Sequence, residues 1–220
     1  MKKRFSTKEL TMLAMISAIA YVLVTTIRIP VVLFLKYEPK DVIITIGGFL
    51  MGPGAVLITS GVVSLIEMFS ISDTGIVGCI MNFLSTCSFA CVAALIYKRN
   101  HTIRGAITGL AVGTVFMTIV MLLWNYLITP LYMGVPRDQV AGMLIPAFLP
   151  FNLIKAGLNS SITLLLYKPL VNGLRKAGLI TTASTASGSA PAGKKPFVLI
   201  FAGLLLITCV LFVLVMRGII

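Results

Sequence analysis

The 220-residue chain is strongly apolar, because hydrophobic residues make up 58% of it and charged residues only 11%. Its mean hydropathy is +1.06, whereas in soluble domains about a quarter of the residues are charged. These values exclude an ordinary soluble domain and indicate an integral membrane protein. The net charge of +12 does not indicate nucleic-acid binding, because the basic residues cluster at the ends of apolar runs, as the positive-inside rule predicts.

The apolar runs are long and lack a two-residue alternation, which favours spanning helices over a β-barrel. A basic N-terminus precedes the first run, from Leu10 to about Ile27. This arrangement resembles a signal peptide, but the run continues beyond Ala18-Ile19-Ala20, which favours an uncleaved helix with a cytoplasmic N-terminus.

Ala14 and Ala18 form a small-xxx-small pair that would let another helix approach closely. Ordinary packing inside the bundle is the alternative for this pair.

Residues 28–41 combine charges with two prolines, which predicts an external loop. Loops over a pocket often act as lids. The following apolar stretch is interrupted by Gly47-Gly48 and by Gly52-Pro53-Gly54. We therefore expect two helices there, over about 41–51 and 53–70, with a turn at Gly52-Pro53-Gly54.

The second of these helices carries Ser60, Ser64 and Glu67 on one face, since they are spaced i, i+4 and i+7. A carboxylate within a membrane segment is a candidate for a functional site by default. Glu67 lies near the helix end, however, and the alternative interpretation is that its carboxylate simply reaches the membrane–water interface.

The rest of the chain predicts a fourth helix over about 78–97, a fifth over 105–128 and a sixth that ends near 174. Residues 129–143 are expected outside the membrane, and the basic residues around 98–104 and 168–176 predict cytoplasmic helix ends. Domain organisation follows from composition. We expect a six-helix membrane domain over 1–180, a flexible linker over 181–195 and an additional C-terminal transmembrane helix within 196–220.

The sixth helix contains Asn152, Lys155 and Asn159 at i, i+3 and i+7, so they share one face. A lysine at the helix centre costs about 2.5–3.5 kcal/mol on insertion scales, and this face is therefore expected to point into the bundle. Asn152 and Lys155 are expected to contact a ligand, together with Asn125 near the outer end of the fifth helix. Such a pocket suits a flat aromatic ligand with a polar edge.

Asn82, Glu67 and Asp41 are further candidate substrate-binding residues. For Asn82 and Asn159, hydrogen bonding between neighbouring helices is an equally good interpretation.

Motifs for catalysis are absent from the sequence. It has no Walker A sequence, no H-E-x-x-H, no G-x-S-x-G and no paired intramembrane carboxylates, so neither a catalytic site nor ATP hydrolysis is predicted. The four cysteines lie in apolar runs without a C-x-x-C pair, and there is only one histidine, so no metal site is predicted.

These residues together resemble the RibU family, the riboflavin-binding S-components of energy-coupling factor (ECF) transporters. The resemblance covers residues 5–176 and rests on a basic N-terminus, a lid-like first loop and four motifs: Ala14-x-x-x-Ala18, Gly52-Pro53-Gly54, Asn125-Tyr126 and Pro150-Phe151-Asn152-x-x-Lys155. The last motif is the most specific part. The linker and the C-terminal apolar run depart from the family pattern.

The resemblance implies an all-α bundle of six transmembrane helices, which here would carry an extra C-terminal helix. It implies capture of riboflavin near the extracellular side, with the first loop closing over it and with flavin contacts from Asn125, Asn152 and Lys155. Riboflavin would be the transported ligand and not a cofactor. Ala14 and Ala18 would dock on a transmembrane coupling subunit, whose two ATPase partners supply the energy.

Three other functions remain open at this point. The chain could be an S-component for another vitamin or for FMN, because the helix framework does not distinguish these ligands. It could instead be a self-sufficient secondary transporter, for which Glu67 and Asp41 offer few coupling groups. A purely structural membrane subunit is the third alternative.

Overall fold

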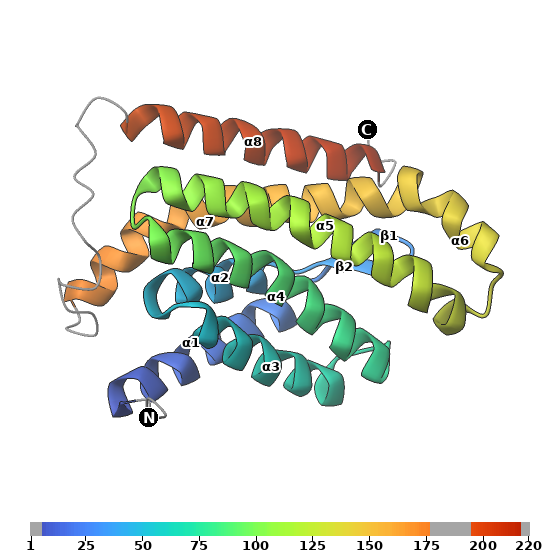
Figure 1. Ribbon diagram of the computed structural model, residues 1–220, viewed down its shortest axis with the longest axis horizontal. Helices are drawn as coiled ribbons and strands as arrows, with labels where there is room; N and C mark the ends of the chain where they lie inside the picture. Colours follow the sequence, from blue (N-terminus) through green and yellow to red (C-terminus); the bar gives the residue numbers. More distant parts are fainter. Residues whose placement is uncertain (1–5, 177–194, 217–220) are drawn as a thin grey trace.

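The computed structural model describes residues 6–176 and 195–216, which fold as a bundle of helices running roughly parallel to its long axis (Figure 1). The helices are α1 (Thr7–Thr26), α2 (Lys40–Met51), α3 (Pro53–Ser70), α4 (Gly75–Arg99), α5 (Ile103–Met133), α6 (Arg137–Met143), α7 (Leu149–Lys176) and α8 (Lys195–Met216). Two short strands, β1 (Ile29–Val32) and β2 (Leu35–Tyr37), form a hairpin between α1 and α2.

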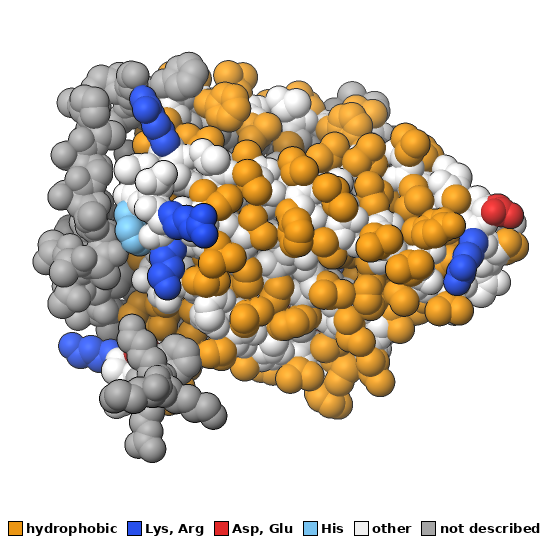
Figure 2. Space-filling view, in the orientation of Figure 1, with side chains coloured by type: hydrophobic (Ala, Val, Ile, Leu, Met, Phe, Trp, Pro, Cys, Tyr) orange, Lys and Arg blue, Asp and Glu red, His pale blue; other side chains and the backbone are white. Residues whose placement is uncertain are grey.

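On the face shown in Figure 2, the surface over the middle of the bundle is apolar, and the charged side chains lie near its two ends. Within the described residues, six segments are long and apolar enough to cross a membrane: Thr7–Thr26, Pro53–Ser70, Gly75–Arg99, Ile103–Met133, Arg137–Tyr167 and Val198–Val215. The short helix α2 is almost completely buried among the others. The predicted multi-pass membrane architecture is therefore confirmed.

The turn between α2 and α3 lies where the sequence places it. Gly52 has φ 92°, a left-handed conformation that favours glycine, and Pro53 occupies the first position of α3, where its missing N–H costs nothing. Gly47 and Gly48 lie inside α2, within the expected helix over about 41–51, and do not interrupt it. A Cβ on Gly48 would lie 2.5 Å from Val56 Cγ2 and 3.1 Å from Ala94 Cβ, so this glycine permits close packing of α2 on α3 and α4.

The segment between α1 and α2, expected as a loop, is instead an antiparallel hairpin that turns at Leu33 and Phe34. Val31, Leu35 and Tyr37 are buried together with Phe148 and Phe151. The alternating burial of β2 explains why this polar segment pairs as strands, since one of its faces packs on the bundle.

Two boundaries near the hairpin end differ from the prediction. Helix α5 continues to Met133 and not to residue 128, with Pro130 inside it, and Gly134 ends it in a left-handed conformation (φ 66°). Residues 137–143, expected as an external segment, form α6, which continues through a π-helical turn, Leu144–Phe148, into α7. The wide π turn accommodates Pro146 and Pro150, which cannot donate the usual helical hydrogen bonds.

The C-terminal helix is present as α8, which packs along α7 and against β1. The predicted linker, residues 181–195, lies outside the described residues apart from Lys195, where α8 begins. Ala14 and Ala18 are exposed on α1, and the buried side of that helix carries Met12, Leu13, Ser17, Ala20 and Val24. This pair is therefore not packed inside the bundle of this chain.

Candidate functional site

A cavity of about 180 Å³ lies where the hairpin, the α3–α4 connection and the ends of α4, α5 and α7 meet. Its apolar wall comes from Phe34, Leu35, Met81, Met121, Tyr132 and Phe151. Its polar wall comes from Arg28, Lys36, Glu38, Asp73, Thr74, Asn82, Ser85, Asn152 and Lys155. The cavity thus combines apolar surface with many hydrogen-bonding groups.

Lys155, the lysine of the sixth predicted helix, is buried and paired. Its Nζ lies 3.3 Å from Asp41 Oδ2 and donates to Ser85 Oγ at 3.2 Å. Asp41 also accepts hydrogen bonds from Thr86 at 2.6 Å and from Asn159 at 3.2 Å. The carboxylate therefore holds Lys155 at the cavity wall, and the lysine keeps N–H groups that can turn toward a ligand.

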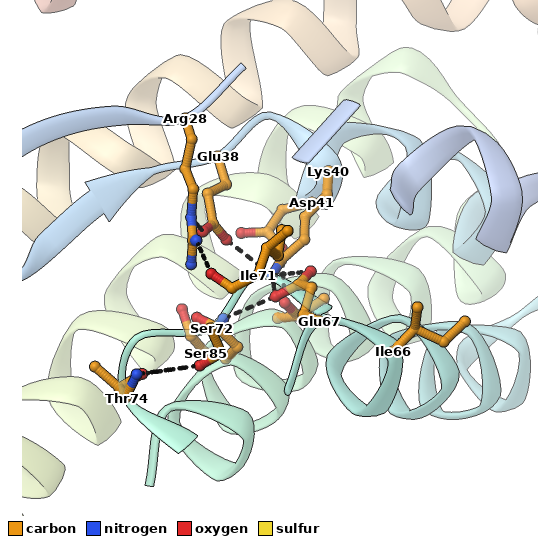
Figure 3. Close-up of polar contacts among 12 residues, drawn as sticks. Arg28, Glu38, Lys40, Asp41, Ile66, Glu67, Ile71, Ser72, Thr74 and Ser85 are labelled. Carbon is orange, nitrogen blue, oxygen red and sulfur yellow. Dashed lines mark hydrogen bonds and ion pairs between the residues drawn. The ribbon is translucent and has the colours of Figure 1, made fainter. Parts of the chain in front are cut away.

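A second charged cluster lies beside it and joins the hairpin to α2, α3 and α4 (Figure 3). Lys40 pairs with Glu38 at 2.8 Å and with both carboxylate oxygens of Glu67. Arg28 Nε donates to Glu38 at 2.8 Å and its Nη1 to the carbonyl oxygen of Ile71 at 2.6 Å. Asn82 donates to Glu67 at 2.9 Å. Two buried carboxylates thus surround one fully buried lysine.

Glu38 and Asp73 stay ionised at neutral pH for different reasons. Burial raises the pKa of Glu38, but the neighbouring Lys40, Lys155 and Arg28 cations outweigh burial and hold that pKa below its usual range. The Lys36 ammonium donates to the exposed Asp73 carboxylate and lowers the pKa of Asp73. This last pair ties the hairpin to the α3–α4 connection beside the cavity.

Aromatic side chains close another part of the cavity. Phe34 at the hairpin turn meets Tyr132 of α5 edge to face, with ring centroids 5.6 Å apart. Phe34, Met81 and Tyr132 also line a second, smaller hollow with Val77, Trp124 and Ile128. Phe34 and Tyr132 therefore line both hollows.

The structure brings most of the predicted site residues together. Asn82, Asn152 and Lys155 line the cavity, and Asp41 and Glu67 lie directly behind it as ion-pair partners. Asn152 Nδ2 currently donates to the Phe148 carbonyl oxygen at 2.8 Å.

Asn125 is buried outside the cavity lining. Its amide donates to the Met121 carbonyl oxygen at 2.7 Å and accepts from Thr129 at 2.9 Å. A ligand contact from Asn125 therefore requires the side chain to leave these partners, and it stays a prediction.

Sequence reasoning missed the hairpin's contribution to the site. Arg28, Lys36 and Glu38 line the cavity, and Lys40 is 1% exposed, although a charged, proline-containing segment is normally solvated. The sequence held one signal, which was charge balance. The buried charges Glu67 and Lys155 lie in apolar runs and need partners of opposite charge, and residues 28–41 supply them as Lys40 and Asp41.

A comparison with family models identifies the fold. The model described as "ECF transporter, substrate-specific component" matches residues 8–167. The chain belongs to this family. It is accordingly a substrate-binding subunit of a membrane transporter and not an enzyme. Helix α8 lies beyond the matched residues.

Similar proteins support the same assignment. The chain is 35% identical over 179 residues to "Riboflavin transporter RibU" of Staphylococcus aureus (strain TCH60), a match covering 77% of this chain and 93% of that protein. It is 28% identical over 185 residues to "Riboflavin transporter FmnP" of Bacillus subtilis (strain 168), covering 77% and 97%. A solved structure described as the S component of a bacterial ECF transporter superposes with a TM-score of 0.65 at 36% identity, covering 76% of this chain and 98% of that one.

The Lys40 cluster predicts a large effect on stability. Replacing Lys40 with Met leaves Glu67 as a buried charge without its cation, and such changes typically cost about 3–5 kcal/mol. We expect Lys40→Met to lower the thermal unfolding midpoint in detergent strongly. Adding Glu67→Gln removes the unpaired charge and should recover more than half of the loss; equal midpoints for wild type and Lys40→Met would contradict this role.

Proposed function

We propose that this chain captures riboflavin in the cavity beside the hairpin and delivers it as the substrate-binding subunit of an ECF transporter. The observation that carries the proposal is the cavity itself. Its lining combines apolar side chains with Asn82, Asn152 and Lys155, in a chain whose matched relatives are named riboflavin transporters. The apolar wall suits the flat rings of a flavin, and the amides and the ammonium suit its carbonyl oxygens and ring nitrogens.

The size of the cavity requires movement on binding. Its volume of about 180 Å³ is below the roughly 300–1,000 Å³ of typical small-ligand sites. The second hollow adds only about 10 Å³, so the hairpin and the aromatic side chains around the cavity would have to move outward to admit a flavin. The hairpin would then close over the bound ring system, with the Lys36 and Asp73 pair securing it.

The balance of charge favours a neutral flavin. The site holds four cations, Arg28, Lys36, Lys40 and Lys155, and four carboxylates, Glu38, Asp41, Glu67 and Asp73, and each of the cations is paired with a carboxylate. A phosphate monoester carries about −1.5 to −2 charges near pH 7. FMN would therefore have to displace a carboxylate from its cation, whereas riboflavin would not.

Competition between the two flavins tests this function. We expect FMN to displace riboflavin from the purified protein at least about tenfold more weakly than unlabelled riboflavin does, which corresponds to roughly 1.4 kcal/mol. Asp73→Asn removes the carboxylate partner of the half-buried Lys36 and should reduce the difference in affinity between riboflavin and FMN. No saturable quenching of flavin fluorescence would refute riboflavin binding, and equal affinities for FMN and riboflavin would refute the charge argument.

Lys155 is expected to contact the flavin. Lys155→Ala should weaken riboflavin binding at least about tenfold, because hydrogen bonds to charged groups contribute roughly 1.5–3 kcal/mol. The substitution also leaves Asp41 unpaired, so Lys155→Ala combined with Asp41→Asn is the matched control. The double variant should recover thermal stability without recovering affinity; recovery of both would make Lys155 a purely structural residue.

The exposed side of α1 supports docking on the coupling subunit. Ala14 and Ala18 are one helical turn apart and both exposed, which leaves room for a second helix to pack closely. The two partner ATPases would then supply the energy.

The basic residues at the opposite end from the hairpin favour a cytoplasmic N-terminus and a cavity near the outer surface.

Bulky residues on α1 should therefore separate uptake from binding. With Trp at positions 14 and 18, we expect riboflavin affinity within about twofold of wild type and ATP-driven uptake reduced at least tenfold. Ile119→Trp, at a 60% exposed position of α5, is the control and should leave both unchanged. Normal uptake by the α1 variant would show that the coupling subunit docks elsewhere.

A further inference from the structure

Helix α8 lies outside the residues that match the family model, yet it has one buried face. Ala202 and Cys209 are 1% and 9% exposed, whereas Leu204 and Leu211 are 60% and 50% exposed. The buried face packs on α7 and reaches β1, and the other face is free for lipid (Figure 1). A helix that crossed the membrane only as an anchor would not need this contact with the hairpin.

Cys209 of α8 packs directly against Gly157 of α7. A Cβ placed on Gly157 of α7 would lie 2.8 Å from Cys209 Sγ, closer than normal packing allows. Cys209 also belongs to the same buried cluster as Leu35 and Tyr37 of the hairpin. The thiol therefore lies at the junction of α8, α7 and the hairpin.

From this junction a chain of hydrogen bonds leads to the cavity. Tyr37 donates to Asn159 Oδ1 at 3.2 Å, and Asn159 Nδ2 donates to Asp41 Oδ2 at 3.2 Å. The same Asp41 oxygen lies 3.3 Å from Lys155 Nζ, at the cavity wall. Displacing Tyr37 would thus release Asn159 and shift the carboxylate that positions the lysine.

We propose that Cys209 and Tyr37 are positioning residues through which α8 holds the hairpin and Lys155 in place and slows escape of the bound ligand. This inference rests on flavin binding at the cavity proposed above. It assigns α8 a role in ligand retention that residues 8–167, the part shared with the family, do not provide by themselves.

A reversible cross-link in the full chain tests the inference. Gly157→Cys places a thiol against Cys209, and the short Cβ to Sγ distance is compatible with a disulfide, whose two Cβ atoms lie about 3.8 Å apart. After mild oxidation, in which the added oxidant accepts two electrons, loss of two free thiols and a mass decrease of two hydrogen atoms are the expected signs. Failure to form this bond would show that Cys209 does not pack against position 157 of α7 and would overturn the inference.

Dissociation of riboflavin is then measured by fluorescence recovery in the oxidised and the reduced state of the same preparation. We expect oxidation to slow dissociation at least about threefold. Wild type under both conditions is the control and should not change. In a Gly157→Cys/Tyr37→Phe variant, which lacks the hydroxyl that reaches Asn159, the effect of oxidation should fall below about twofold. Equal rates in both states of a fully cross-linked Gly157→Cys protein would overturn the proposal.

A second pair of variants tests the packing of α8 on α7, one by disturbing it and the other as a control. Cys209→Phe overfills the space opposite Gly157 and should speed riboflavin dissociation at least about fivefold, whereas Leu211→Phe on the exposed face of α8 should not. Equal effects of the two substitutions would overturn the proposal. If the disulfide forms in Gly157→Cys but wild type binds no riboflavin, the proposed function is refuted, and the retention role is refuted with it. If wild type binds riboflavin but the cross-link does not change its dissociation, only the retention role is refuted.

Discussion

The charges buried at the hairpin end of the bundle must be matched, and the rest of the site depends on that constraint. Lys40, Lys155, Glu67 and Asp41 each lie at most 6% exposed, where an unpaired charge would cost several kcal/mol. Their pairing requires the segment after α1 to fold back as a hairpin, α2 to enter the centre of the bundle, and α3, α4 and α7 to present polar faces toward it. The cavity is the space that remains beside these pairs.

This arrangement explains how an apolar bundle can recognise a polar molecule. Lys155 and Asn82 are held by carboxylates behind the wall, so their orientation is set before a ligand arrives. Preorganised polar groups lose less entropy on binding than mobile ones. Because the cations are balanced by carboxylates, we propose that the site binds a ligand that is polar and uncharged. The aromatic side chains of the hairpin turn and α5 would provide the apolar surface for its ring system.

Sequence reasoning predicted the helices and the spacing of the α7 motif because both depend on local pattern: long apolar runs, the break at Gly52-Pro53, and the three-and-four spacing of Asn152, Lys155 and Asn159. The hairpin, the helical extension through Pro130 and the π turn before α7 were not predicted. Each of these depends on tertiary packing: Leu35 and Tyr37 are buried in the hairpin, Thr129 and Pro130 at the end of α5, and Phe148 in the π turn. Burial of Lys40 could not be read from a segment whose charges are typical of a solvated loop, since its partner Glu67 lies 27 residues away in the chain.

The central claim is that the cavity is built for a neutral flavin. Its most direct test is to identify by mass spectrometry the small molecule that remains bound to the full-length protein purified from cells grown with riboflavin. We expect riboflavin to be bound in a nearly one-to-one ratio to the protein. A different vitamin, or a phosphorylated flavin as the main bound species, would contradict it.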